Sequence, residues 1–166
     1  MFDWLIRRAK RTPYYHLTGY MNRWWLVPYW QFAAGPGTGP VRFTQRPIAW
    51  LFQRFNLSVR VHEILRSDLG RDPHDHPFNY LTIILKGAYW ERRFDDRGRC
   101  VSRKRHKVGA IMWRPARSWH MIEVDGGPVT TLFITGRKTD GTWGFNVDGK
   151  KVPRREYEST HGRPWA

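Results

Sequence analysis

Short runs in which apolar and polar residues alternate dominate the chain from about residue 58 onward. In SVRVHEILR, residues 58–66, one face of an extended strand carries Val59, Val61 and Leu65, and the other carries Arg60, His62 and Arg66. Alternation with a period of two is typical of a strand with one buried face. YLTIILKGAYWERRF, residues 80–94, reads as one or two further β runs, and others fall near 108–113, 119–124 and 129–135. Many short strands at close spacing predict a sandwich or a barrel.

Turn signals and one helical pattern complete this outline. Hairpin turns are predicted at Asp96-Arg97-Gly98 and at Asp148-Gly149. Residues 2–11 place Phe2, Leu5 and Ile6 on one side of a helical wheel, which predicts a short amphipathic helix that ends before Pro13. The Gly- and Pro-rich stretch 33–40 predicts a loop. A chain of 166 residues is expected to form one domain.

Two histidines separated by one residue are the first candidate for chemistry. On a strand, His74 and His76 project to the same side, about 6–7 Å apart at the backbone, while Asp75 faces away. Two neutral imidazoles at that separation can chelate one ion at about 2.0–2.1 Å. His120 lies just inside a later strand that follows Pro115, and it can supply a third ligand. Three ligands leave coordination positions open for water or substrate.

The spacing of these residues resembles the two motifs of the cupin family. The first motif, with His-x-His, a carboxylate ligand and a glycine, is similar to His74, His76, Tyr80 and Gly87. The second, with a glycine, a proline and a histidine, is similar to Gly109, Pro115 and His120. The match covers roughly residues 58–135. The resemblance implies an all-β fold, a double-stranded β-helix or jelly-roll barrel, with the short helix added at the N-terminus.

The chain departs from the family pattern at several positions. Tyr80 stands where the family has its glutamate ligand, so the four-ligand site of the family is not available. Arg117 replaces the turn glycine, Val124 replaces an asparagine, and Asp68 stands at the first glycine position. Within this resemblance, residues 1–57 are the helix and an aromatic-rich lead-in packed on the barrel. Residues 58–166 are the barrel core and the C-terminal strands.

A cupin with three histidines and no carboxylate resembles the thiol dioxygenases and some dioxygenases of small organic acids and diketones. That resemblance implies ferrous iron, an oxygenase activity and a small-molecule substrate, while three imidazoles also suit zinc, manganese or nickel. The chain is also similar to small cupins of phage and bacterial genomes, which supply a fold and no substrate. A sugar isomerase or epimerase, a barrel that binds metal or ligand without turnover, and a basic nucleic-acid- or virion-associated protein stay open as alternatives.

Three further residues are candidates for roles beside the metal. Tyr80 shares a strand face with His76, so its hydroxyl can reach the metal or a substrate, and it is the candidate catalytic residue. Glu63 interrupts the apolar face of its strand, where a carboxylate is costly unless it is paired or bound to metal. It is a candidate either to orient an imidazole or to supply the missing carboxylate ligand from another strand. Trp113 is a candidate pocket residue. The remaining loop or basic-context histidines are expected to be solvated: His16, His106 and His161.

Composition adds expectations about partners and compartment. The net charge of +15 is spread along the chain without a nucleic-acid-binding signature, which predicts at most weak, sequence-independent binding of nucleic acid. No apolar run is long enough to span a bilayer, and the first residues do not read as a secretory signal. A single cysteine excludes an internal disulfide and fits a reducing compartment. We therefore expect a cytoplasmic protein, and the family resemblance implies that it can form a homodimer.

Overall fold

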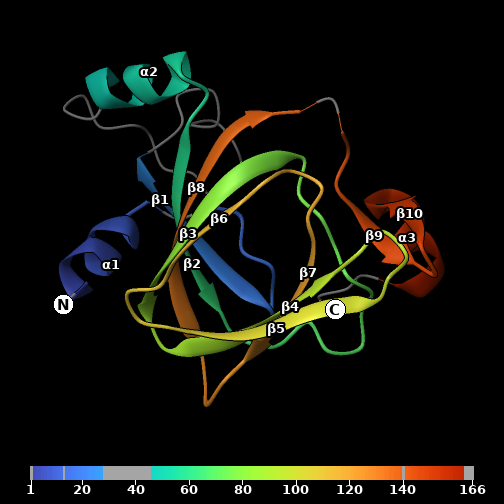
Figure 1. Ribbon diagram of the computed structural model, residues 1–166. Coiled ribbons are helices and arrows are strands. Elements are labelled where there is room, and N and C mark those ends of the chain that lie inside the picture. Colours follow the sequence, from blue (N-terminus) through green and yellow to red (C-terminus); the bar gives the residue numbers. More distant parts are fainter. Residues whose placement is uncertain (1, 13, 28–45, 140, 163–166) are drawn as a thin grey trace.

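The computed structural model describes residues 2–12, 14–27, 46–139 and 141–162 (Figure 1). Within these residues the helices are α1 (Asp3–Ala9), α2 (Arg46–Arg54) and α3 (Arg154–His161). The strands are β1 (Met21–Val27), β2 (Ser58–Ile64), β3 (Phe78–Lys86), β4 (Ala88–Phe94), β5 (Cys100–Lys107), β6 (Ile111–Arg114), β7 (Trp119–Val124), β8 (Val129–Lys138), β9 (Gly144–Val147) and β10 (Lys150–Pro153). The predicted all-β architecture with a short N-terminal helix is confirmed.

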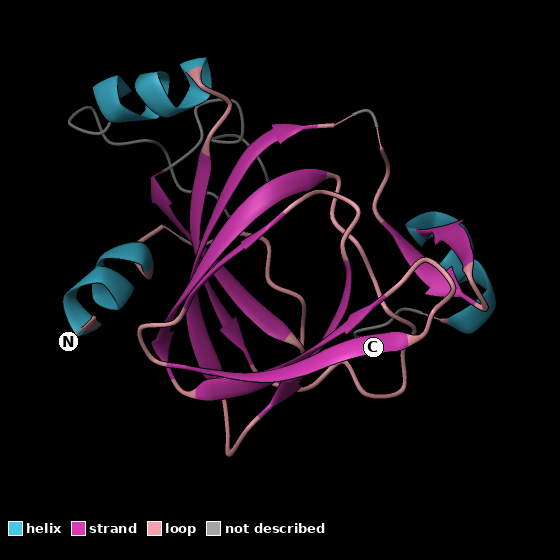
Figure 2. Cartoon of the chain, in the orientation of Figure 1, coloured by secondary structure: helices cyan, strands magenta, loops and turns pink. Residues whose placement is uncertain are grey.

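The strands form two larger antiparallel sheets and one hairpin. Five strands pair in the order β1-β2-β8-β3-β6, and three pair in the order β5-β4-β7. Strands β9 and β10 form the hairpin, with the predicted turn at Asp148-Gly149. Figure 2 shows the two larger sheets as facing walls joined where β3 runs into β4. This arrangement is a barrel whose interior is lined by alternate residues of both sheets.

The chain before residue 58 supplies a strand of the barrel itself, in addition to a helix that packs on it. Strand β1 comes from the aromatic stretch and pairs with β2 along its length, with Arg23 opposite His62. Helix α1 packs on the outer side of this sheet, where Ala9, Trp24, Val61 and Leu85 form a buried apolar cluster. Two helices were not predicted: α2 (Figure 1) and α3. The predicted loop 33–40 lies outside the described residues.

The faces of β2 have the opposite roles from those we expected. Val59 and Val61 are buried on the outer side of the sheet, and Val61 packs in the cluster with α1. The polar face, with Arg60 and His62, points into the barrel and lines its cavity. Helix α1 packs on the apolar face of β2 from outside the barrel. The polar face of the strand therefore points into the barrel interior. Among the described residues, no helix has the length and apolarity needed to cross a membrane.

Gly87 and Gly109 end strands and adopt positive φ angles of +79° and +88°. A Cβ on Gly87 would lie 2.9 Å from the backbone oxygen of Pro128 and 3.3 Å from Cα of Val129. A Cβ on Gly109 would meet no described atom within 4 Å. Any residue other than glycine would therefore have a strained backbone at either position. Only at position 87 would its Cβ also clash with neighbouring atoms.

We expect Gly87→Ala to destabilise the fold more than Gly109→Ala. The strain common to both should cost about 1–2 kcal/mol, and the clash at Gly87 should add roughly 1–3 kcal/mol. Urea denaturation of the two variants beside the unmodified protein measures the difference. Equal destabilisation would show that the contact with the backbone of Pro128 is readily relieved.

Candidate metal centre

A cavity of about 280 Å³ lies inside the barrel and is lined by both larger sheets. Its walls include residues of β1, β2, β3, β6 and β8 on one side and of β4 and β7 on the other. Many of the side chains that line it are apolar or aromatic, and Phe133, Met112 and Ile64 are examples. The size is at the low end for small-ligand sites, which are about 300–1,000 Å³. The cavity therefore suits a small molecule.

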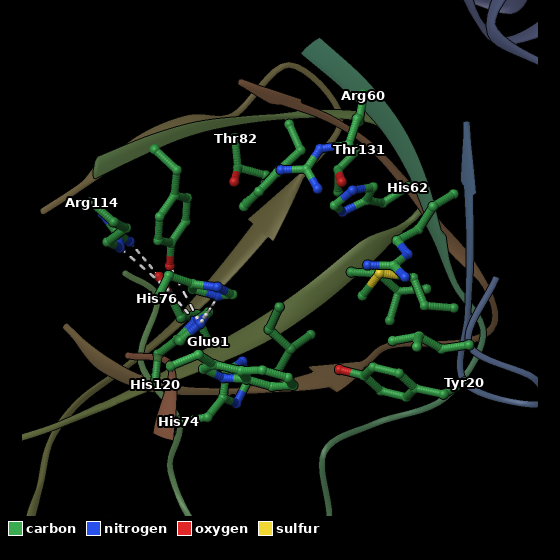
Figure 3. A pocket seen from close by; sticks show the side chains of 18 of the residues that line it. Tyr20, Arg60, His62, His74, His76, Thr82, Glu91, Arg114, His120 and Thr131 are labelled. Atoms are coloured by element: carbon green, nitrogen blue, oxygen red, sulfur yellow. Dashed lines mark hydrogen bonds and ion pairs between the residues drawn. The ribbon is translucent and has the colours of Figure 1, made fainter. Parts of the chain in front are cut away.

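His74, His76 and His120 meet at one end of this cavity (Figure 3). Their candidate ligand atoms all lie within 4.8 Å of one another. An antiparallel bridge fixes the first and third: the backbone N–H of each of His74 and His120 donates to the carbonyl of the other at 3.0 Å. His76 follows two residues later. The structure brings together the three histidines that the sequence singled out.

The separation of two of the imidazoles fits a shared divalent ion. Nε2 of His76 lies 3.2 Å from Nε2 of His120. Two nitrogens bound at about 2.1 Å to one ion, with tetrahedral to octahedral angles, lie roughly 3.0–3.4 Å apart. This separation is thus what a shared ion requires without movement of either ring. Three nitrogen donors with no carboxylate among them suit iron, zinc and nickel.

Burial keeps two of these imidazoles in the neutral form that binds metals. It lowers the pKa of His74 well below 6.5, and the neighbouring charges of His120, His76 and Arg71 lower it further. Burial is also the main reason why the pKa of His76 lies well below that value, with contributions from His120 and Arg60. At neutral pH neither ligand needs to lose a proton before it can coordinate an ion.

Buried carboxylates lie behind two of the histidines. Oε1 of Glu91, on β4, lies 3.4 Å from Nδ1 of His120, an electrostatic contact rather than a well-aligned hydrogen bond. Oδ2 of Asp68 lies 3.9 Å from Nδ1 of His74. With Nδ1 turned to a carboxylate, each ring presents Nε2 to the centre. Carboxylates in this position orient metal-binding imidazoles and make them better donors.

Each carboxylate is held by further contacts. Glu91 pairs with Arg114, and His106 lies 3.2 Å away on β5. Burial alone would raise the pKa of Glu91, but His120 and Arg114 outweigh it and hold that pKa far below the usual range. Asp68 accepts from the Tyr20 hydroxyl at 2.6 Å and pairs with Arg71. Both carboxylates are therefore held in place, and Glu91 is ionised at neutral pH.

Sequence reasoning missed these supporting residues. His106 was expected to be solvated, but it is only 6% exposed because its side chain turns inward to Glu91. The sequence did contain one signal for Glu91: it is the single acidic residue of strand β4, which is otherwise apolar and basic. Asp68 gave no signal beyond occupying the position of a family glycine. The contacts of both carboxylates join segments far apart in the chain.

Tyr80 lies beside the metal ligands, and Glu63 and Trp113 do not. The Tyr80 hydroxyl is 3.3 Å from Nε2 of His120, and burial, with Glu91 nearby, raises its pKa well above 10. Glu63 is on the outer face of β2, where it accepts a hydrogen bond from Asn22 at 3.0 Å, so the expected contact with an imidazole is absent. Trp113 is 59% exposed on β6 and does not line the cavity. Strand alternation points both of these side chains away from the interior.

Comparison with solved structures identifies the fold. Vicilin from Capsicum annuum is 13% identical, with a TM-score of 0.55 over 95% of this chain and 40% of vicilin. Hydroxypropylphosphonic acid epoxidase from S. wedmorenis is 14% identical, with a TM-score of 0.50 over 76% of this chain and 56% of that chain. DMSP lyase DddQ from Ruegeria pomeroyi DSS-3 is 17% identical, with a TM-score of 0.45 over 57% of this chain.

These likenesses show the fold alone, because the identities are low. The chain has the cupin fold, the double-stranded β-barrel that its motifs resemble. It spans 45% of the length of the lyase and 40% of the length of vicilin. No family model matches the chain, and no curated protein sequence matches it.

The buried neutral histidines predict that the metal-free protein loses stability as the pH falls below about 6.5. The pKa values of His62, His74 and His76 are depressed in the folded state, so the unfolded chain binds more protons and acid favours it. Each group contributes at most about 1.4 kcal/mol per pH unit. Urea denaturation of chelator-treated protein from pH 8 to pH 5.5 measures the effect. The depressed pKa of Glu91 affects the free energy of unfolding only at pH values below this window. Unchanged stability across this window would contradict the assignment of buried, neutral imidazoles.

Proposed function

We propose that the protein is a metal-dependent cupin enzyme, an iron(II) oxygenase that acts on a small molecule. The observation that carries the proposal is the group formed by His74, His76 and His120 at one end of the barrel cavity. When bound there, ferrous iron would supply redox chemistry and open coordination positions for dioxygen and substrate. One protein with a similar fold is by its name an epoxidase, so the fold is compatible with an oxidative reaction.

The chain's own residues support such a site in three ways. His74 and His120 are buried and joined by their backbone bridge, and the half-buried His76 lies beside them, so the donor set is assembled by the fold itself. Glu91 and Asp68 lie behind two of the rings and balance part of the charge that a cation brings. The cavity lies inside the barrel, where electrostatic contacts to a bound substrate are stronger than in water.

Tyr80 is suited to donate a hydrogen bond and not to give up its proton. Its raised pKa keeps the phenol neutral at physiological pH, and its oxygen lies at 3.3 Å from the imidazole of His120. A phenol that stays protonated can stabilise negative charge that develops on a neighbouring oxygen atom of a substrate. We therefore assign Tyr80 as the catalytic hydrogen-bond donor.

Weak nucleic-acid binding and homodimer formation stay predictions from the sequence.

We expect the purified protein to hold about one divalent ion per chain. His74→Ala, His76→Ala and His120→Ala should each reduce the metal content severely, because each removes one of three protein donors. Elemental analysis of protein purified without added metal measures both quantities. His161→Ala is the matched control, since His161 is exposed on α3, stacks on Tyr157 and is not one of the three clustered imidazoles. Full occupancy in any two of the three ligand variants would refute the site.

Tyr80→Phe should retain the metal and the fold but lose turnover. Removing one hydrogen-bond donor aimed at developing charge typically lowers kcat by roughly 10²–10³-fold. Oxygen uptake by iron-loaded protein, screened with thiols, diketones and aromatic hydroxy acids, provides the assay. If oxygen uptake is lost in His120→Ala and unchanged in Tyr80→Phe, the protein is an oxygenase in which Tyr80 has no catalytic role. Uptake equal to that of free iron across the panel would favour a binding module over an oxygenase.

A further inference from the structure

Two arginines and a histidine lie side by side on the inner face of the β1–β2 pair. Arg23 on β1 is opposite His62 on β2 in the strand register, and Arg60 is two residues before His62 on the same face. All three line the cavity that holds the metal ligands (Figure 3 labels Arg60 and His62). Cross-strand partners and residues at i and i+2 are neighbours on one face of a sheet. The three side chains thus form one nitrogen-rich surface, named here the cationic wall.

The cationic wall has no carboxylate partner among the described residues. Other cavity arginines are neutralised: Arg114 pairs with Glu91, Arg71 with Asp68 and Arg154 with Glu158. The guanidinium of Arg60 instead lies over the rings of Tyr14, Trp25 and Phe133, at 5.4–5.8 Å from their centroids. Nε of Arg23 donates to the backbone oxygen of Tyr15 at 2.7 Å. Two positive charges therefore face the cavity without a compensating acid from the described part of the chain.

Buried polar atoms in the cationic wall also lack hydrogen-bond partners in the described part of the chain. Nε of Arg60 and Nε2 of His62 are both buried and unpaired. His62 is 7% exposed, and its ring stacks on Phe133 with the centroids 4.7 Å apart. An unsatisfied buried donor costs about 1–3 kcal/mol, so native proteins rarely leave two in one place without a ligand. An anion that accepts from these nitrogens would satisfy them and neutralise the charge.

Phe133 connects the cationic wall to the metal centre. Its ring centroid lies 4.7 Å from that of His62, 5.9 Å from that of the metal ligand His76 and 5.0 Å from that of Tyr80. The guanidinium carbon of Arg60 is 5.4 Å from the same ring. A molecule held by the cationic wall therefore lies about one aromatic ring from the metal ligands, with Phe133 along its apolar body.

We propose that the cavity binds a small organic oxyanion, with its carboxylate or phosphonate head on Arg60 and His62 and its apolar part against Phe133. This inference rests on the proposed function, because it names the substrate class of the same centre. The planar fork of a guanidinium matches both head groups. The cavity of about 280 Å³ limits the ligand to a few carbon atoms beyond that head.

The test compares anionic and neutral probes of similar shape. Butanoate and propylphosphonate are the anions, butanamide is the neutral probe, and ligand-observed NMR at pH 8 measures the Kd of each for the metal-loaded protein. We expect the preferred anion to bind at least tenfold more tightly than the amide. Arg60→Gln should weaken its binding roughly 10- to 100-fold, the range for a hydrogen bond between charged partners, and leave the amide unchanged. Arg60→Lys keeps the positive charge and loses the planar fork of the guanidinium. Its affinity for the anion should lie between those of the unmodified protein and Arg60→Gln.

Arg137→Gln is the matched control. Arg137 is exposed on β8 and does not line the cavity, so this variant loses the same charge without touching the cationic wall. Anion binding that is equal in Arg60→Gln and Arg137→Gln would overturn the proposal, and so would an absence of preference for anions over the amide. Circular dichroism and thermal melting establish that each variant is folded. If Arg60→Gln fails to fold, Arg60→Lys and Arg23→Gln carry the comparison.

Two further measurements separate this inference from the proposed function. Metal content should be the same in Arg60→Gln and in the unmodified protein, because Arg60 is not a ligand. An anion preference that depends on Arg60 and persists in metal-free His120→Ala supports the oxyanion site even if no oxygenase activity is found. Normal metal content and oxygen uptake without an Arg60-dependent anion preference would instead keep the metal centre and refute the oxyanion site.

Discussion

The bridge between His74 and His120 is the contact on which the site depends. Two backbone hydrogen bonds of 3.0 Å join the segment before β3 to β7, which belongs to the other sheet. This pairing fixes two metal-ligand candidates side by side without using their imidazoles. His76 lies two residues further along this segment, before β3, and completes the group of three imidazoles. The ligand set is thus a consequence of backbone pairing, and the side chains stay available for an ion.

Charge inside the barrel is arranged in two zones. Around the three histidines the charges are paired: Glu91 and Asp68 lie behind His120 and His74, and each is held by an arginine. Across Phe133, Arg23 and Arg60 face the cavity with no acid of the described residues beside them. A small cavity that is prepared for a cation at one end and an anion at the other fits a substrate held by its charge beside a metal.

The fold and the ligand set were largely predictable from the sequence, because both depend on local periods. Alternation in β2, the turn at Asp148-Gly149 and the spacing of His74, His76 and His120 carried that information. The solvated role expected for His106 was wrong, and Glu63 lies outside the cavity. The two errors have separate causes: α1 covers the apolar face of β2, so Glu63 points away from the interior, and His106 on β5 turns inward to Glu91.

The sequence by itself determined which residues could share a strand face and which three imidazoles could bind one ion. Only the tertiary structure decided which face became the interior. It brought Glu91 behind His120 and Asp68 behind His74, over separations of 29 and 6 residues that follow no sequence period. It also set Arg60 and His62 against Phe133. The physical reason is that strand alternation is a local property of the backbone, whereas charge pairing and burial depend on how separate strands close into a barrel.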